Sequence, residues 1–317
     1  MKQELIDRAI KKLQLAAKMS EQYYGKTLII AYSGGKDSDV LLALARMSGI
    51  KYELINSHTT VDAPETVYHI REVFAVERAR GGMATILYPT YKGGPTNMWK
   101  LIVYKNVPPT RIARYCCKVL KEQSTPNRIV ALGVRREESI QRSSRNDFEI
   151  RGQTKFKSSG FTYEHSAEVY EEAQTRDEVW DCKLITAAKK NSDLMVNPII
   201  EWKTTDIWDF IRENGIKYNP LYDRGYTRVG CVGCPMASKK EIAKEFSDYP
   251  KFKENYIRAF DRLIKKRKER GIACDWETGE DVFRWWTQDD TIKGQITIAE
   301  WMKEAQIQNV PRERQIR

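Results

Sequence analysis

Histidine is scarce in this chain, and long apolar runs are missing. The sequence has three histidines in 317 residues. No apolar run approaches the roughly 18 to 20 residues that a membrane-spanning helix needs. The segment from Met1 to Lys18 mixes charges throughout, which is unlike a signal or transit peptide. We therefore expect a soluble, cytoplasmic protein with no membrane partner.

An excess of acidic residues is missing as well. The chain carries 54 Lys and Arg against 43 Asp and Glu, which gives a formal net charge of +11. This balance excludes a strongly acidic surface and allows a polyanionic partner. The 41% hydrophobic and 31% charged residues are typical of a globular protein rather than a disordered one.

Apolar periodicity predicts alternating helices and strands. A helix is expected over the first 24 residues, and unbroken apolar runs of strand length then alternate with segments of helical periodicity. The expected strands are Thr27–Tyr32, Tyr52–Asn56, Ala84–Tyr88 and Arg128–Gly133. One expected helix ends near Gly49, a second runs from Glu65 to about Arg80, and a third runs from Thr205 to Asn214. This alternation predicts an α/β fold with a doubly wound parallel sheet.

The most informative segment joins the first expected strand to the helix after it. It is Ser33-Gly34-Gly35-Lys36-Asp37-Ser38. The two glycines allow a tight turn whose amides, aided by the helix dipole, form a phosphate site. Lys36 adds a positive charge and the serines add hydroxyl donors, whereas Asp37 is either a Mg²⁺ ligand or a first-turn helix carboxylate. The segment is not the nucleoside-triphosphate P-loop, which needs G-x-x-x-x-G-K-[ST].

Four of the six cysteines form two close pairs, Cys116-Cys117 and Cys231-x-x-Cys234. A disulfide framework is not expected in a cytosolic chain of this length. A C-x-x-C that contains glycine forms a tight knuckle suited to zinc or iron–sulfur ligation. Three interpretations stay open: a [4Fe–4S] cluster, a zinc site, and reduced cysteines without metal. The other two cysteines, Cys182 and Cys274, are either ordinary residues or persulfide carriers.

The Gly-Gly loop, which is the segment from Ser33 to Ser38, resembles the pyrophosphatase loop of the adenine-nucleotide α-hydrolase superfamily. Together with the cysteine pairs, it resembles the iron–sulfur branch of the phosphoadenylyl-sulfate and adenylyl-sulfate reductase family. Similar proteins cleave ATP between the α- and β-phosphates, adenylate an acceptor oxygen and release pyrophosphate. The resemblance implies that Ser33 to Ser38 bind ATP with Mg²⁺, that Lys36 and Asp37 are catalytic, and that the four paired cysteines bind a [4Fe–4S] cluster.

Further segments resemble the same family, in the same order along the chain. They are Val61–Thr66, Gly133–Ser139 with Arg142, Asn197–Trp202, and Pro220–Tyr226. The resemblance assigns Asp62 and Gly133 to ATP binding. It assigns substrate binding to Arg135, Arg136, Arg142 and Tyr226, and it assigns Arg135 and Arg136 a catalytic role as well. The alternative for these two arginines is a solvated helix start, and the alternatives for His58 are a structural histidine and a wall of the nucleotide pocket.

We divide the chain into an N-terminal helix (1–24), a pyrophosphatase-loop domain (25–236) and a basic helical C-terminal subdomain (237–317). The insertion at about 138–183 is polar with little periodicity, and is either an active-site loop or a solvated excursion. Between Lys239 and Arg270 there are twelve Lys or Arg and six Asp or Glu, a net charge of +6. This stretch is either a solvated helix end or a surface for nucleic-acid phosphates.

Two features separate the chain from the reductases of the family. No cysteine follows Cys274, whereas the reductases carry a nucleophilic cysteine near their C-terminus, and the Gly-Gly loop is complete, as in ATP-cleaving members. We expect a sulfurtransferase that resembles those of DNA phosphorothioation, with sulfide or a persulfide from a cysteine desulfurase as sulfur source. DNA is the expected acceptor and RNA the alternative. The rival hypotheses are a sulfate-adenylate reductase that produces sulfite, a tRNA thiolation enzyme, and a non-catalytic regulator that binds nucleic acid.

Overall fold

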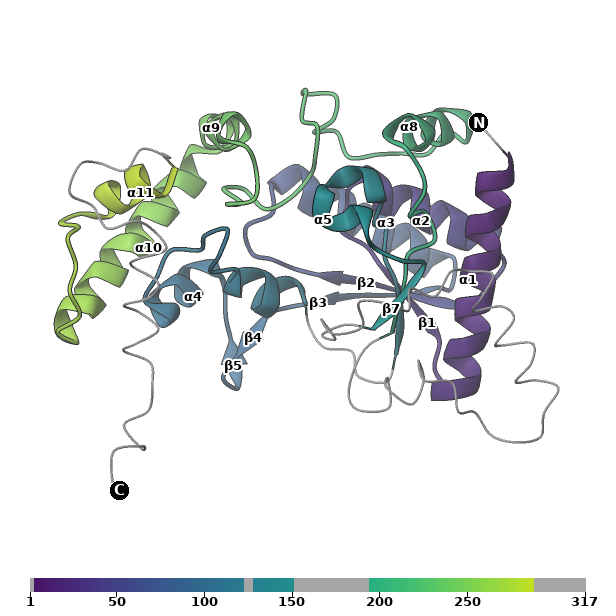
Figure 1. Cartoon of the computed structure of the whole chain (residues 1–317), viewed down its shortest axis with the longest axis horizontal. Coiled ribbons are helices and arrows are strands. Elements are labelled where there is room, and N and C mark those ends of the chain that lie inside the picture. Colours follow the sequence, from purple (N-terminus) through teal and green to yellow (C-terminus); the bar gives the residue numbers. More distant parts are fainter. Residues whose placement is uncertain (1–2, 123–127, 151–193, 288–317) are drawn as a thin grey trace, which may run out of the picture. The chain divides into compact units, whose positions relative to one another are not determined.

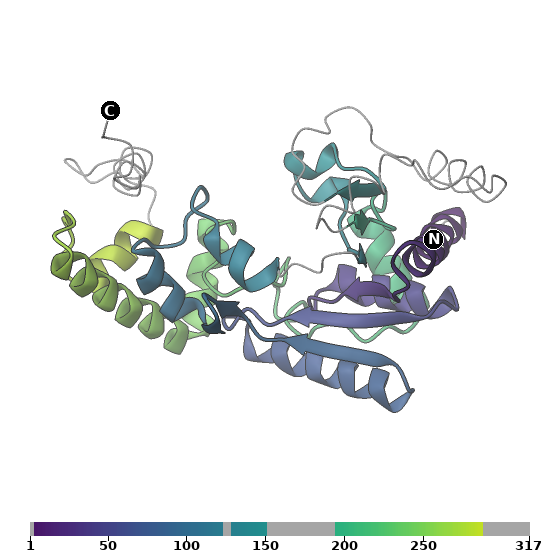
Figure 2. The ribbon, with the colours of Figure 1, turned by 90° about the horizontal axis from the view of Figure 1, so that it is seen from below.

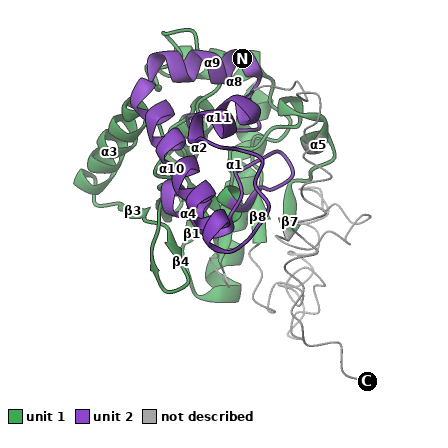
Figure 3. Ribbon diagram, turned by 90° about the vertical axis from the view of Figure 1, so that its left-hand side faces the viewer, with its two compact units in different colours: residues 1–97, 116–231 green, residues 98–115, 232–317 purple. Residues whose placement is uncertain are grey.

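The structure, a computed structural model, describes residues 3–122, 128–150 and 194–287. The chain divides into two compact units, which are described separately (Figure 3). The first comprises Met1–Asn97 and Cys116–Cys231, and the second comprises Met98–Tyr115 and Val232–Arg317. The second unit thus includes a segment that the sequence analysis placed in the pyrophosphatase-loop domain. Cys182 and residues 151–183 of the insertion lie outside the described residues.

A six-stranded sheet forms the centre of the first unit (Figure 1). Its strand order is β3-β2-β1-β6-β8-β7, with all neighbours parallel except β7, which runs antiparallel to β8. The strands are β1 (Leu28–Ala31), β2 (Tyr52–Ser57), β3 (Met83–Leu87), β6 (Ile129–Ala131), β7 (Phe148–Ile150) and β8 (Leu194–Val196). The predicted α/β class with a mostly parallel sheet is therefore confirmed.

Helices flank this sheet, and Figure 2 shows α3 alongside β2 and β3. The α-helices of the first unit are α1 (Gln3–Tyr24), α2 (Lys36–Met47), α3 (Pro64–Ala79), α5 (Ile140–Ser143) and α8 (Thr204–Glu213). A π-helix, a 3₁₀ helix and a short hairpin complete it: η1 (Cys117–Lys121), η2 (Arg136–Glu138), β4 (Thr90–Tyr91) and β5 (Gly94–Pro95). The amphipathic pattern at the start of the chain thus forms the predicted N-terminal helix.

The core of the first unit is apolar and continuous across both sheet and helices. Leu28 and Ile30 of β1 are fully buried, as are Leu41 and Leu44 of α2. Residues of α1, α3, β6, β8 and α8 join the same cluster. Burying this apolar surface, at about 25 cal/mol per Å², is the main force that fixes the sheet edge on which the candidate site is built.

The loops that follow β1, β2, β6 and β8 all leave the same edge of the sheet, because these strands are parallel. The chain passes from β1 to β2 on one side, whereas β6 lies on the other side of β1. Open α/β sheets bind ligands at the carboxyl ends of strands where the order reverses in this way. The Gly-Gly loop follows β1, at that point of reversal.

The second unit is helical and has an aromatic core. Its helices are α4 (Met98–Lys105), α9 (Lys239–Asp248), α10 (Pro250–Glu269) and α11 (Gly279–Thr287). Tyr256 packs against Trp99, Phe246 and Trp286, with ring centroids 4.7 to 5.7 Å apart. The predicted helical C-terminal region is therefore confirmed. No helix among residues 3–122, 128–150 and 194–287 is long and apolar enough to cross a membrane.

Candidate functional site

The Gly-Gly loop forms the turn from β1 into α2, which begins at Lys36. Gly34 has a positive φ of 76°, and a Cβ there would lie 2.8 Å from Cγ1 of Ile70. Only glycine meets both conditions without strain. The Ser38 hydroxyl donates to the Gly35 carbonyl at 2.7 Å and lies 3.1 Å from the Gly35 amide. The loop is therefore a tight turn that leads directly into the amino end of α2.

The charged residues of the loop are paired with each other and with Arg135. The Lys36 ammonium donates to one Asp37 carboxylate oxygen at 3.0 Å, and Arg135 Nε donates to the other at 2.6 Å. The Lys36 and Arg135 side chains are only 7% and 3% exposed. The structure thus brings together three of the predicted catalytic residues in one ion-paired row.

Arg135 connects three loops of the sheet edge. Besides Asp37, its guanidinium donates to Glu137 at 3.0 Å, to the Trp202 carbonyl at 3.4 Å and to the Thr204 hydroxyl at 3.3 Å. Hydrogen bonds from the side chain and backbone of Thr204, with that from Arg135, lower the pKa of Glu137. These partners follow β1, β6 and β8, so that Arg135 is directed into the protein.

Arg136 and Arg142 differ from Arg135 in exposure. Their side chains are each 41% exposed, and Arg136 Nε donates to the Arg145 carbonyl at 3.1 Å. Arg142 forms an ion pair with Glu138. Arg136 also lies 3.9 Å from the Glu201 carboxylate. Both arginines are therefore partly exposed and each has a carboxylate partner.

Gly133, predicted to bind ATP, lies against the first turn of α2. A Cβ at this position would lie 2.9 Å from the Asp37 carbonyl oxygen and 3.3 Å from the Ser38 amide nitrogen. The backbone that leaves β6 therefore approaches the Gly-Gly loop too closely for any side chain. In the sequence, the only sign of this close approach is that Gly133 follows an expected buried strand.

The segment before Cys231 packs over the loop. The Tyr222 hydroxyl accepts the Lys36 amide at 3.0 Å, and Asn219 donates to the Gly34 carbonyl at 3.0 Å. Burial raises the pKa of Tyr222. Tyr226, the predicted substrate residue, is buried within the same segment. Sequence reasoning selected Tyr226 and missed Tyr222 and Asn219, although both lie in or beside the Pro220–Tyr226 motif.

A buried polar cluster lies directly beneath the loop and was not predicted. Tyr32 donates its hydroxyl hydrogen bond to Asp39, and His69 Nε2 lies 3.0 Å from both the hydroxyl and the carboxylate. Burial raises the pKa of Asp39, and burial with the neighbouring Asp39 raises that of Tyr32 well above its ordinary value. A single sequence offers no signal for this cluster, because Tyr32 follows β1 whereas Asp39 and His69 lie on α2 and α3.

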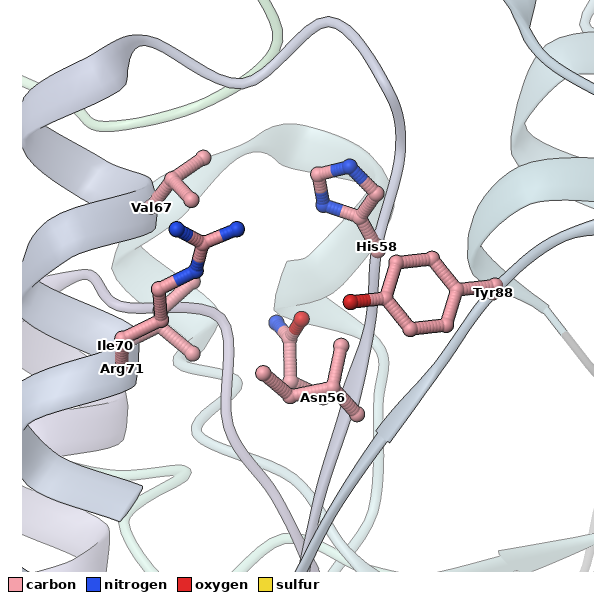
Figure 4. Close-up of a pocket in the computed structure, with 7 residues that line it drawn as sticks. Asn56, His58, Val67, Ile70, Arg71 and Tyr88 are labelled. Carbon is pink, nitrogen blue, oxygen red and sulfur yellow. The ribbon is translucent and has the colours of Figure 1, made fainter. Parts of the chain in front are cut away.

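A pocket lies at the carboxyl ends of β2 and β3 (Figure 4). Its lining residues are Asn56, His58, Val67, Ile70, Arg71, Ile86 and Tyr88. The rings of His58 and Tyr88 meet edge to face at 5.5 Å on one side, and Arg71 extends from α3 on the other. The pocket therefore has two aromatic walls and one cationic group. Its lining also includes Ile70, which lies close to Gly34 of the Gly-Gly loop.

Asp62 links the turn after β2 to the first cysteine of the C-x-x-C. Its carboxylate accepts the Thr59 amide at 3.1 Å and lies 3.9 Å from His58 Nδ1. Its backbone pairs with that of Cys231 in an isolated antiparallel bridge. The structure thus attaches Cys231 to the loop region predicted to bind ATP.

The four paired cysteines lie at two chain segments. The π-helix η1 begins at Cys117, directly after Cys116, and Cys231 and Cys234 flank a turn in which Gly233 has a φ of 71°. Cys116, Cys117 and Cys231 belong to the first unit, whereas Cys234 belongs to the second. In the part of the chain that the structure describes, no three His, Cys, Asp or Glu side chains converge to hold a metal ion. The predicted cluster ligands therefore stay a prediction.

The second unit holds the turn of the C-x-x-C firmly. The Gly233 amide donates to Glu245 at 2.7 Å, and the Tyr256 hydroxyl donates to the Val232 carbonyl at 3.0 Å. A Cβ on Gly233 would lie 2.6 Å from Phe246 Cζ. Arg111, which precedes the Cys116-Cys117 pair, donates to the Pro235 carbonyl at 3.0 Å. The segment that precedes the Cys116-Cys117 pair is thus hydrogen-bonded to the residue that follows Cys234.

The basic stretch of α10 has two faces with different roles. Lys266 donates to the Val103 carbonyl at 2.9 Å, and buried Arg267 donates to the Asn106 carbonyl at 3.1 Å. These cations satisfy carbonyl groups at the end of α4 and beyond it. The exposed basic residues of α10 and its end are Lys251, Arg258, Arg262, Lys265, Lys268 and Arg270. Part of the charge predicted to bind nucleic acid is therefore structural.

Comparison with known families and proteins gives a consistent match. Residues 27–237 match the family described as Phosphoadenosine phosphosulfate reductase domain. The uncharacterised protein MJ0973 of Methanocaldococcus jannaschii is 26% identical over 262 residues, which cover 80% of this chain and 53% of that protein. An adenosine 5'-phosphosulfate reductase of Anoxybacillus flavithermus is 38% identical over 71 residues, 22% of this chain and 29% of the reductase. The chain spans about half the length of the M. jannaschii relatives that it matches.

Solved structures resemble the chain at low identity. A phosphoadenylyl-sulfate reductase from Candida auris, in a phosphate complex, is 18% identical with a TM-score of 0.43, over 73% of this chain and 96% of the reductase. The U34-tRNA thiolase NcsA from Methanococcus maripaludis, with its [4Fe-4S] cluster, is 11% identical with a TM-score of 0.42, over 87% of this chain and 84% of the thiolase.

Proposed function

Because the chain belongs to the phosphoadenosine phosphosulfate reductase domain family, we propose that it is an ATP-cleaving sulfurtransferase that acts on nucleic acid. The observation that carries this proposal is the complete Gly-Gly loop at the amino end of α2, with Lys36 and Asp37 beside it. The amino end of a helix with a lysine beside it is a site for phosphate groups. We propose DNA as the acceptor, as in DNA phosphorothioation.

The loop residues would bind the pyrophosphate part of ATP. The amide of Gly34 and the hydroxyl of Ser33 would donate to phosphate oxygens. The amides of Gly35 and Lys36 would do so in place of their present bonds to the Ser38 and Tyr222 hydroxyls. The Lys36 amide already points at an oxygen atom, the Tyr222 hydroxyl, at 3.0 Å. The Lys36 ammonium would exchange its bond to Asp37 for one to a phosphate oxygen, which is also an anionic acceptor.

Asp37 is the residue best suited to hold Mg²⁺. Its carboxylate lies at the loop, is 16% exposed, and provides the oxygen ligands that Mg²⁺ prefers. The bound ion would neutralise charge on the phosphates. Arg135, with its bond to Asp37 at 2.6 Å, would keep the carboxylate oriented when Lys36 turns to the phosphates.

The pocket beside the loop has a volume of about 10 Å³, room for about one water molecule, so the nucleoside part of ATP would lie outside it. The rings of His58 and Tyr88 would border the nucleoside there. Asp62, with His58 and Thr59 on its carboxylate, would fix the turn that borders the nucleoside.

The reaction balances in two displacements. An acceptor oxygen attacks the α-phosphorus of ATP, a new oxygen–phosphorus bond forms, and pyrophosphate leaves. Sulfide then attacks the atom that bears this oxygen, and AMP leaves with the oxygen. Arg136 and Arg142 would hold the anionic acceptor, since both present guanidinium groups to solvent. The exposed basic residues of α10 would contact the nucleic-acid backbone.

The four paired cysteines fit a [4Fe–4S] cluster by their donor chemistry, which is four thiols in two pairs. Cys116, Cys117, Cys231 and Cys234 would hold it, one thiolate on each iron, and the bound cluster would shape the site beside the loop. The proposed source of the transferred sulfur is free sulfide or the persulfide of a cysteine desulfurase. The outer sulfur of the persulfide would become sulfide when a second thiol attacks the inner sulfur, with a disulfide as the other product. Cys116 and Cys231 are buried, which would limit oxidation of the bound group.

The test is an assay of pyrophosphate release from ATP by anaerobically purified protein, with DNA, with tRNA and without nucleic acid. We expect release that DNA stimulates more than tRNA. Stimulation by tRNA alone would replace DNA with RNA as the acceptor. Sulfite formed from a sulfate adenylate, with no cleavage of ATP, would instead assign the chain to the reductases of its family. Stoichiometric zinc without absorbance near 400 nm, roughly where iron–sulfur clusters absorb, would refute the proposed cluster.

A further inference from the structure

Two polar clusters join α2 to α3, one at each end of the helix pair. At the amino ends, Asp39 of α2 meets His69 of α3 at 3.0 Å. At the carboxyl ends, Arg46 of α2 meets Glu77 of α3 at 2.6 Å. A tyrosine hydroxyl bonds the carboxylate in each cluster, from Tyr32 at the amino ends and from Tyr52 at the carboxyl ends. The two clusters are therefore alike in chemistry and differ in place.

The cluster at the amino ends encloses the Gly-Gly loop. Tyr32 is the residue immediately before Ser33–Ser38, and Asp39 is the residue immediately after it. The hydrogen bond between their side chains therefore closes the loop at its base, and His69 fixes both partners from α3. The cluster at the carboxyl ends encloses no loop of this kind.

The backbone of Tyr32 is fixed as well. Its amide donates to the Ile55 carbonyl at 2.8 Å, and its own carbonyl accepts from the Asn56 side chain at 2.8 Å. Tyr32 thus gives the loop a rigid starting point in the sheet. The side chains of Asp39 and His69 are each 2% exposed, so neither reaches a nucleotide bound outside the loop.

We propose that Tyr32, Asp39 and His69 are positioning residues that hold the phosphate loop in its binding shape. A loop with two glycines has many unbound conformations, and ordering it on binding costs affinity. A side-chain bond across its base removes many of these conformations before the ligand arrives. The inference rests on the proposed function in one respect, which is that this loop binds the pyrophosphate part of ATP.

The experiment compares Tyr32→Phe with Tyr52→Phe in the full chain. Each substitution removes one hydroxyl that donates to a carboxylate between the same two helices. Calorimetric titration with Mg²⁺ and inorganic pyrophosphate measures loop affinity, and thermal unfolding measures stability. We expect Tyr32→Phe to weaken pyrophosphate binding roughly tenfold, because such hydrogen bonds are worth about 1.5 kcal/mol. Tyr52→Phe should lower the unfolding temperature similarly and leave the affinity within about twofold.

Asp39 supplies a second comparison that preserves side-chain size. Asp39→Asn keeps an acceptor oxygen for the Tyr32 hydroxyl, whereas Asp39→Leu keeps none. We expect Asp39→Asn to retain most of the pyrophosphate affinity that Asp39→Leu loses. His69→Gln should lie between them, because its amide can still donate to Asp39.

Three outcomes are decisive. Weaker binding confined to the Tyr32, Asp39 and His69 variants would support the inference. Pyrophosphate affinity that is the same in Tyr32→Phe, Tyr52→Phe and the unsubstituted chain would overturn it and leave the proposed function standing. Failure of the unsubstituted chain to bind pyrophosphate would overturn the proposed function and the inference with it.

Discussion

At the scale of single residues, Arg135 shows how an arginine can serve an anion site without facing solvent. Its charge is buried, and breaking such a pair leaves an uncompensated charge in the protein. Asp37 and Glu137 neutralise the guanidinium, and Thr204 and the Trp202 carbonyl occupy further donors. We infer that Arg135 orients the carboxylate of Asp37, whereas Arg136 and Arg142 meet the acceptor.

Arg135→Lys tests this role. A lysine cannot reproduce the fork of donors, so the bond to Asp37 should weaken by about 1.5 to 3 kcal/mol. Pyrophosphate release should then fall roughly 10- to 100-fold in kcat. Arg128→Lys is the matched control, since Arg128 precedes β6 and donates to Glu53 at 2.8 Å, at the opposite end of the strand from Arg135. Equal losses in the two variants would show that Arg135 acts only through stability.

Gly34→Ala tests whether the turn of the loop is set by its backbone. The substitution introduces a Cβ at a φ of 76° and 2.8 Å from Ile70 Cγ1. Gly25→Ala is the control, because Gly25 has a φ of 59° with no atom within 4 Å of an added Cβ. Denaturant unfolding should show a loss of about 1 kcal/mol for Gly25→Ala and at least twice as much for Gly34→Ala. Only Gly34→Ala should weaken pyrophosphate binding, and a larger loss for Gly25→Ala would contradict the steric account.

At the scale of helices and strands, the sequence predicted long periodic segments well. The predicted strand Tyr52–Asn56 corresponds to β2, and the predicted helix from Glu65 to about Arg80 corresponds to α3. The strands β7 and β8 were missed, because β7 lies within the polar insertion at about 138–183, where no apolar run marks it, and β8 follows shortly after that insertion. The π-helix that begins at Cys117 was missed because its backbone pattern has no periodic side-chain signature.

The helix α10 illustrates what charge counting does not resolve. All of its lysines and arginines contribute equally to the net charge of the segment, yet Arg267 is 5% exposed and bonded to backbone carbonyls. Lys265 and Lys268 are exposed. Burial depends on which face of the helix packs against the aromatic core, and that packing is a property of the folded unit.

Nucleic-acid binding separates the two kinds of basic residue on α10. A Lys265→Ala and Lys268→Ala double substitution should weaken DNA binding and reduce the slope of log affinity against log salt by about 2, one for each lost phosphate contact. Arg267→Ala should instead destabilise the second unit, because the Asn106 carbonyl loses its donor. Filter binding at several salt concentrations, with thermal unfolding of each variant, checks both. An unchanged salt slope in the double variant would exclude this face of α10 from the DNA contact.

At the scale of the whole molecule, the candidate site is an edge of the sheet rather than a list of motifs. Motif order along the chain predicted the loop residues, Asp62 and Gly133, and the structure places Gly133 against Asp37. The Tyr32, Asp39 and His69 cluster and the Tyr222 contact were not predictable, because they depend on distances between residues far apart in sequence. The net charge of +11 likewise includes buried cations such as Arg267, and these must be counted separately from the exposed cations that a polyanion could contact.

The position of the bond that is cleaved in ATP tests the central claim most directly. Anaerobically purified protein would be incubated with α-labelled and γ-labelled ATP, Mg²⁺, sulfide and DNA, and the labelled products separated by chromatography. The account predicts AMP and pyrophosphate in equal amounts, with Asp37→Asn reducing both. ADP and inorganic phosphate, or no cleavage of ATP at all, would contradict it.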